Sequence, residues 1–143
     1  MKATLGHIGI NLSNSTESFR FWKDLLKYLD FELLEETKYH FDATDGTSYL
    51  CINEVESDYK KDGFHRKRIG LNHVAFRVSS SQLVDAFASE FLEPNGIQSL
   101  YGGAKLYPEY TEGYYAVFFE DPDRIKVEVV YEPLSSSAAF TDG

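Results

Sequence analysis

Three side chains of this 143-residue chain have the chemistry of ligands for a divalent metal ion: His7, His73 and Glu128. Each histidine lies in a segment of alternating apolar residues, and Glu128 lies between two valines in an apolar stretch. A single strand histidine is more often a structural residue, and a single carboxylate can be an edge-strand charge. Together, however, two imidazoles and one carboxylate can hold a divalent ion and leave coordination positions open.

The two histidines occupy equivalent places in an internal repeat. They are 66 positions apart (73 − 7), and the same offset aligns Phe31 with Ile97 without a gap. Such a repeat constrains the architecture, because each copy is expected to form the same supersecondary unit. We therefore expect His7 and His73 to lie on the first strand of each copy, facing away from the helix that covers that strand.

Each copy has the pattern of a strand, a helix and three further strands. Alternating apolar residues predict the first strand, a serine-rich cap comes next, and apolar spacings of three and four predict the helix. A hairpin turning at Asp45-Gly46 closes the first copy, and one turning at 121–124 closes the second. The later strands are predicted over 31–39, 40–43 and 47–55, and over 97–101, 114–120 and 125–131.

These patterns predict an α+β fold of two tandem βαβββ modules whose curved mixed sheets form a metal-binding cup. One module of about 60 residues buries its sheet poorly alone, so the modules are expected to share a cavity. We expect a single domain over 1–134, with module one at about 4–56, a linker at 57–68 and module two at about 69–133. Residues 135–143 are expected to form a loose tail.

The acidic composition restricts the partners. The 23 acidic and 14 basic residues give a net charge of −9, so no strong positive field is available for nucleic-acid phosphates. The basic residues at 60–61 and 65–68 are interpreted as a solvated linker. A single cysteine, Cys51, favours a cytoplasmic setting, and no signal-peptide or membrane-spanning run is found. We expect a small-molecule substrate and no nucleic-acid or membrane partner. The sequence is also compatible with a homodimer.

Three motifs carry a resemblance to a known family: Gly-His-Ile-Gly at 6–9, Leu-Asn-His-Val-Ala-Phe at 71–76, and Phe-Phe-Glu-Asp-Pro-Asp-Arg-Ile-Lys-Val-Glu at 118–128. Over about residues 4–133 the chain resembles the vicinal oxygen chelate superfamily of glyoxalases, bleomycin resistance proteins and extradiol dioxygenases. Arg124 stands where that family often has glycine. The three motifs together are specific for the fold and much less specific for the reaction.

The resemblance implies a role for each of the three side chains. It implies that His7, His73 and Glu128 hold one divalent ion, with Zn, Ni, Fe(II) and Mn as the candidates, and that Glu128 is also a catalytic residue. It further implies bidentate binding of a substrate with neighbouring oxygens, which such a metal stabilises as an enediolate or a related anion.

One departure from the family pattern bears on the reaction. Glyoxalase I members usually place a second glutamate in the closing strand of module one. Aligning the two hairpin turns puts Leu50 at that place, and a slip of one residue puts Tyr49 or Cys51 there. None of these is a carboxylate. The remaining ligand set resembles that of ring-cleaving dioxygenases and fosfomycin-modifying transferases, although no basic residue follows Glu128 to hold a phosphonate.

Four aromatic or imidazole side chains are candidates for substrate binding: Tyr39, His40, Tyr101 and Tyr110. They lie in two segments expected at the rim of the cup, 38–41 and 101–110, and His40 is also a candidate general base. Ordinary strand and turn aromatics would give the same pattern.

Three functions therefore compete. The leading one is a divalent-metal-dependent enzyme of the glyoxalase type, with lyase or isomerase chemistry on a small molecule with vicinal oxygens. The first alternative is an extradiol-type Fe(II) dioxygenase, although the ring-cleaving members of the family are usually longer. The second is a non-catalytic drug- or metabolite-binding protein, although such members usually lack the ligand residues.

Overall fold

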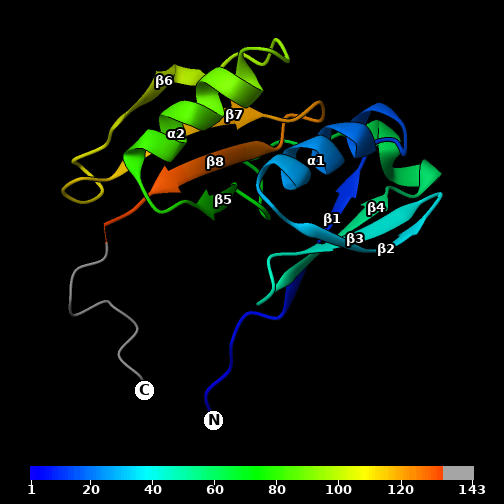
Figure 1. Ribbon diagram of the computed structural model, residues 1–143. Coiled ribbons are helices and arrows are strands. Elements are labelled where there is room, and N and C mark those ends of the chain that lie inside the picture. The colour runs from blue at the N-terminus through cyan, green and yellow to red at the C-terminus, as the bar shows by residue number, and fades with distance from the viewer. Residues whose placement is uncertain (134–143) are drawn as a thin grey trace. The chain divides into compact units, whose positions relative to one another are not determined.

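The computed structural model describes residues 1–133, and it contains the predicted repeat (Figure 1). The predicted tail at 135–143 lies outside the described residues. Module one contains β1 (His7–Leu12), α1 (Glu17–Tyr28), β2 (Glu32–Thr37), β3 (His40–Thr44) and β4 (Tyr49–Glu54). A 3-10 helix, η1 (Ser57–Asp62), follows it. Module two contains β5 (Val74–Arg77), α2 (Ser81–Phe87), the π-helical η2 (Ala88–Leu92), β6 (Leu100–Leu106), β7 (Tyr115–Glu120) and β8 (Lys126–Tyr131).

Both modules have the same sheet topology. The strand orders are β1-β4-β3-β2 and β5-β8-β7-β6. The first strand of each module pairs in parallel with the last, and the other pairs are antiparallel. The predicted α+β fold of two βαβββ modules with curved mixed sheets is therefore confirmed.

The chain divides into two compact units. The first comprises residues 1–65 together with the β7–β8 turn at 121–125, and the second comprises 66–120 and the chain from 126.

The β7–β8 turn contributes a buried carboxylate to the first unit. Asp121 accepts hydrogen bonds from Trp22 Nε1 at 2.8 Å and from the backbone N–H of Asp123 and Ile125 at 2.8 and 2.7 Å. Its burial raises the pKa of Asp121 to about 6.

The core of the first unit lies between its sheet and α1. Phe41 and Ile52 are fully buried on the face toward the helix, and the rings of Phe19 and Phe41 are 5.2 Å apart. The helix begins after Asn14, whose side-chain oxygen accepts from the backbone N–H groups of Thr16 and Ser18. The residues between the buried ones on each strand therefore face away from the helix.

The core of the second unit is built in the same way, with two differences from the sequence prediction. Phe87 of α2 packs against Phe119 of β7, with ring centroids 5.4 Å apart, and Ser80 caps the helix through its side chain. The predicted helix ends as the π-helical segment η2. The strand predicted over 97–101 is wrong in position, because β6 runs from Leu100 to Leu106 and includes Gly102 and Gly103.

No helix within residues 1–133 is both long enough and apolar enough to span a membrane.

Candidate metal and substrate site

His73 and the buried Glu128 carboxylate form a pair of donor groups in the second unit. Glu128 stands on β8 opposite Ala75 of β5, and His73 immediately precedes β5. His73 Nε2 lies 3.2 Å from Glu128 Oε2, and the other ring nitrogen, Nδ1, lies 2.7 Å from Asn72 Oδ1. The carboxylate is 1% exposed, so this charge lies among protein groups rather than in water, in agreement with the apolar flanks seen in the sequence.

Tyr114 supplies a second partner for the buried carboxylate. Its hydroxyl donates a hydrogen bond to Glu128 Oε1. Burial, followed by the hydrogen bond to Glu128, raises the pKa of Tyr114 well above its ordinary value. The phenol therefore keeps its proton and remains a donor to the carboxylate. Sequence reasoning did not assign this contact, because a donor 14 residues away on a neighbouring segment leaves no local signal.

His7 lies in the first unit, on the face of the sheet that points away from α1. Its ring stacks on Tyr49, with centroids 4.6 Å apart and an interplanar angle of 18°. Tyr49 is the register partner of His7 on β4. Within residues 1–133, no three His, Cys, Asp or Glu side chains are grouped as a preformed metal site. The structure therefore brings together two of the three predicted ligands, His73 and Glu128.

The strand registers settle which residue of module one corresponds to Glu128. Cys51 pairs with Gly9 on β1, as Glu128 pairs with Ala75 on β5. The alignment that put Leu50 at this place is wrong by one residue. The cause is the turns: four residues, 45–48, separate β3 from β4, whereas five, 121–125, separate β7 from β8.

Cys51 belongs to a polar cluster on the same face of module one. His40 Nδ1 lies 2.7 Å from Asn53 Oδ1, and His40 Nε2 lies 2.9 Å from Asp42 Oδ1. The second contact has the distance of an ion pair without hydrogen-bond geometry. The Asn53 contact, opposed by burial and assisted by Asp42, raises the pKa of His40. Burial and then Asp42 raise the pKa of Cys51, which keeps it a thiol.

The tyrosines predicted to bind substrate lie in different surroundings. Tyr39 is 53% exposed at the β2–β3 turn, with Lys38 Nζ 5.1 Å from its ring centroid. Tyr110 packs edge-on against Tyr114 at 5.1 Å, so one ring separates it from Glu128. Tyr101 packs edge-on against Phe118 at 5.5 Å, and Phe118 is the register partner of Glu128.

Two basic side chains near Tyr101 were not predicted as site residues. Lys126 Nζ lies 5.0 Å from the Tyr101 ring centroid, and Arg66 Nη1 donates to Glu120 Oε2 at 2.8 Å. The interpretation of 65–68 as a solvated linker is wrong for Arg66, whose side chain is only 18% exposed. The spacing of Lys126 and Glu128 by two residues on one strand was the available signal, because such residues share a face.

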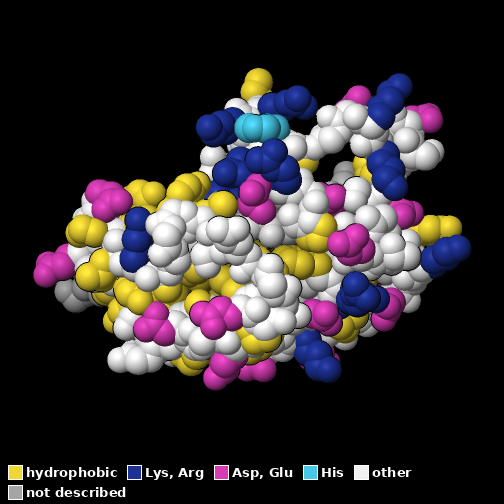
Figure 2. All heavy atoms as spheres, turned by 90° about the horizontal axis from the view of Figure 1, so that it is seen from above, with side chains coloured by type: hydrophobic (Ala, Val, Ile, Leu, Met, Phe, Trp, Pro, Cys, Tyr) yellow, Lys and Arg dark blue, Asp and Glu magenta, His cyan; other side chains and the backbone are white. Residues whose placement is uncertain are grey.

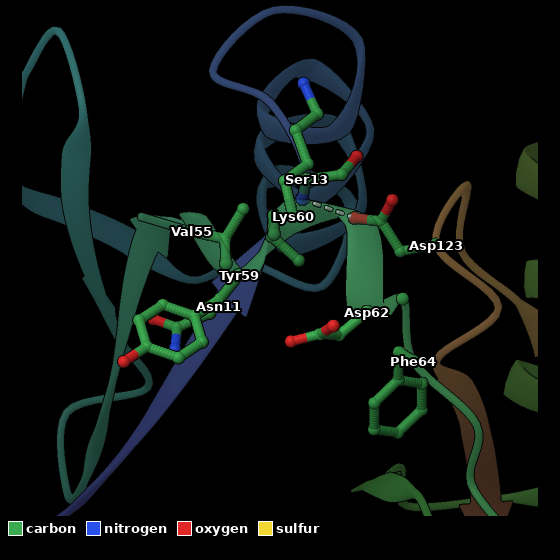
Figure 3. A pocket seen from close by; sticks show the side chains of 10 residues that line it. Asn11, Ser13, Val55, Tyr59, Lys60, Asp62, Phe64 and Asp123 are labelled. Atoms are coloured by element: carbon green, nitrogen blue, oxygen red, sulfur yellow. Dashed lines mark hydrogen bonds between the residues drawn. The ribbon is translucent and has the colours of Figure 1, made fainter. Parts of the chain in front are cut away.

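A separate cavity of about 500 Å³ lies within the first unit, at the end of β1 and beneath η1 (Figure 3). Among the residues that line it are Asn11, Tyr59, Lys60 and Asp62, and the backbone N–H of Ser13 donates to Asp123 at its edge. Figure 2 shows several basic side chains gathered around a histidine, with an acidic side chain directly against them and further acidic side chains over the rest of this face.

Comparison with known proteins identifies the family. The sequence model of the Glyoxalase/Bleomycin resistance protein/Dioxygenase superfamily matches residues 4–129. The chain belongs to this superfamily. Within the superfamily, the chain is 36% identical over 124 residues to the uncharacterized protein YqjT of Bacillus subtilis, covering 87% of this chain and 95% of that protein.

Two further relatives extend the superfamily assignment. The chain is 25% identical over 129 residues to the metallothiol transferase FosB of Staphylococcus saprophyticus, covering 90% of this chain and 77% of FosB. The crystal structure of a glyoxalase candidate from Bacillus halodurans superposes with a TM-score of 0.82 at 36% identity, covering 92% of this chain and 97% of that one. The fold and the membership of this superfamily are thus shown.

Proposed function

We propose that this chain is a divalent-metal-dependent enzyme that performs lyase or isomerase chemistry on a small molecule with vicinal oxygens. In this proposal His7, His73 and Glu128 hold one ion. The observation that supports it most strongly is the contact of His73 with the buried Glu128 carboxylate. Removal of a carboxylate from water is unfavourable unless the carboxylate is paired or ligates a metal.

The donor chemistry fits a divalent ion. One imidazole nitrogen, from the residue before β5, and one carboxylate oxygen, from β8, already lie 3.2 Å apart. Asn72 lies against the remote nitrogen of His73, and such a contact fixes the orientation of a ligating imidazole. The imidazole of His7 would complete a set of two histidines and a carboxylate, which suits Zn, Ni, Fe(II) or Mn and leaves positions for substrate.

The bound ion would act as a Lewis acid that polarises a carbonyl oxygen of the substrate. The surrounding residues would hold and orient the reactants. The Tyr114 hydroxyl donates to Glu128 and holds the carboxylate in one orientation. His40, whose pKa is raised by Asn53 and Asp42, remains the candidate in module one for moving a proton.

One observation favours a second candidate, an extradiol-type Fe(II) dioxygenase. The counterpart of Glu128 in module one is Cys51, whose raised pKa keeps it neutral. A site with two histidines and a single carboxylate has the ligand chemistry of non-haem Fe(II) oxygenases. Identification of the preferred ion distinguishes the two reactions: Fe(II) supports oxygen chemistry, whereas Ni or Zn supports a lyase or isomerase.

Elemental analysis tests the proposal. The protein is stripped with a chelator, reloaded separately with Zn, Ni, Mn and Fe(II), and analysed alongside His73→Ala and the control His65→Ala. We expect about one ion per chain in the wild-type protein and in His65→Ala, and almost none in His73→Ala. Equal metal content in wild-type and His73→Ala protein, or no metal in any of them, would overturn the proposal and favour a binding protein.

A further inference from the structure

Tyr101 adopts an uncommon backbone conformation beside the candidate site. Its φ is 57°, and Gly102 and Gly103 follow with φ values of 86° and 95°. The ladder between β6 and β7 shifts register between Leu100 and Lys105, so this segment is a bulge. Bulges re-aim side chains, and a non-glycine residue with positive φ is more frequent at functional sites than elsewhere. Here the Tyr101 ring packs against Phe118, the partner of Glu128 in the ladder.

Two cationic side chains converge on this tyrosine. Lys126 Nζ lies 5.0 Å from the ring centroid of Tyr101 and 4.7 Å from that of Phe118. Lys126 first, opposed by burial, and then Arg66 lower the pKa of the Tyr101 hydroxyl. Arg66 also pairs with Glu120, at 2.8 Å. Arg66 and Lys126 together with Glu120 carry a net charge of +1, and the neighbouring Glu128 carboxylate has its own partners in Tyr114 and His73.

The cluster lies beside the donor pair on the same face of the second sheet. Lys126 and Glu128 are two residues apart on β8, so their side chains share a face. The Tyr107 hydroxyl lies on this face too. Tyr107 packs on Phe118 at 5.3 Å and is 5% exposed, and its oxygen has no hydrogen-bond partner among the described residues. A buried hydroxyl in that state points to a bound water or ligand.

We propose that Arg66, Lys126 and the Tyr101 hydroxyl form an oxyanion-binding subsite beside His73 and Glu128. Its ligand is the carboxylate or phosphate-type group of a small substrate, and this part of the inference rests on the proposed function. Arginine presents several N–H donors in a planar fork, and lysine supplies a compact charge. The subsite thus specifies an anionic substrate, with its charged group on the Lys126 side of Glu128.

Anion titration of metal-free protein tests the subsite, with inorganic phosphate and malonate as the tetrahedral and planar probes. Binding is measured by calorimetry and by amide shifts of Tyr101 and Lys126. The variants are Arg66→Gln, Lys126→Gln and Tyr101→Phe. Lys105→Gln is the matched control, because Lys105 lies 5.3 Å from the Tyr107 ring centroid and belongs to the same sheet. Each protein is compared with wild type by circular dichroism to confirm its fold.

We expect saturable binding of at least one probe to wild-type protein. Loss of Arg66 or Lys126 should weaken it about tenfold or more, loss of the Tyr101 hydroxyl less, and Lys105→Gln about twofold or less. The subsite would be overturned by any of three results. These are an unchanged anion affinity in both Arg66→Gln and Lys126→Gln, an equal loss of affinity in Lys105→Gln, or anion binding only after metal loading. The test is separable from the proposed function: a chain that binds the anion and no metal retains the subsite and loses the enzyme proposal.

Discussion

The two modules share a strand order and a histidine, but the sheet faces that carry these histidines differ. In module one, His7 stacks on Tyr49, and Cys51 stands on the strand beside it. In module two, His73 lies 3.2 Å from Glu128, which stands at the place that corresponds to Cys51. At equivalent positions of the repeated backbone, the sheet of module one thus carries a thiol and the sheet of module two carries a buried carboxylate.

This difference shows how the two positions depend on their neighbours. A buried carboxylate needs hydrogen-bond partners, and module two supplies the Tyr114 hydroxyl and the His73 imidazole. A neutral thiol has no such requirement, and burial together with Asp42 keeps Cys51 neutral by raising its pKa. At these two equivalent positions the carboxylate therefore stands in module two, whereas module one has a neutral thiol beside the Asp42 carboxylate of its own polar cluster.

The largest expected effect is a difference in metal affinity between substitutions at Glu128 and at its counterpart, Cys51. Glu128→Gln keeps the shape of the side chain but removes an anionic ligand, so we expect metal affinity to fall roughly a hundredfold or more. Cys51→Ser should change it less than about threefold. Competition against a chromophoric chelator measures both. Equal losses of metal affinity in the two variants would mean that both modules supply an anionic ligand. That result would contradict the proposal that only Glu128 does so.

A second contrast concerns the hairpin turns. Burial raises the pKa of Asp121 from 3.8 to about 6. Between these values the folded state binds more protons than the unfolded state, so this group makes stability fall as pH rises, by about 3 kcal/mol at most. We expect Asp121→Asn to remove that fall, as measured by urea unfolding across the same pH range.

The turn of module one should behave with the opposite sign. Backbone N–H groups of Ser48 and Thr47 lower the pKa of Asp45. Its contribution is present above the unfolded pKa and is lost as pH falls through the folded pKa. Asp45→Asn should therefore reduce the loss of unfolding free energy as the pH falls. The change should be smaller than that expected for Asp121→Asn, because Asp45 is exposed. A change of the same sign in both variants would show that the two turns are equivalent.

Tyr114→Phe should lower metal affinity less than Glu128→Gln does, and it tests whether the Tyr114 hydroxyl supports the buried carboxylate. Loss of its hydroxyl leaves Glu128 with one fewer donor, which we expect to cost about 1–3 kcal/mol in unfolding and about tenfold in metal affinity. Tyr115→Phe is the control, because its hydroxyl donates to Asp85 at 2.6 Å at the surface. A Tyr114→Phe protein as stable and as metal-competent as Tyr115→Phe would exclude this supporting role.

The sequence predicted the elements better than the contacts between them. The repeat offset and the alternation of apolar residues located β1, β5 and both closing hairpins, because these signals are local. The β6 strand was misplaced because Gly102 and Gly103 are typical of loops, whereas here they form a bulge within the strand. Cys51 could not be chosen over Leu50, since the choice depends on a one-residue difference between turns.

The candidate site was only partly predictable for the same reason. His73 and Glu128 were predicted from their residue types and the repeat, and the structure brings them together. Arg66 was missed because its pairing with Glu120 joins residues 54 positions apart. No local pattern distinguishes such an arginine from its solvated neighbours in a basic run.

In the proposed function, one ion is held by His7 of module one together with His73 and Glu128 of module two. The most direct test is the metal content of His7→Ala, measured after reloading and compared with wild-type protein. We expect this single change to remove nearly all of the bound ion. Retention of a full equivalent of metal by folded His7→Ala protein, while His73→Ala loses it, would place the site in module two alone and contradict a site that includes His7.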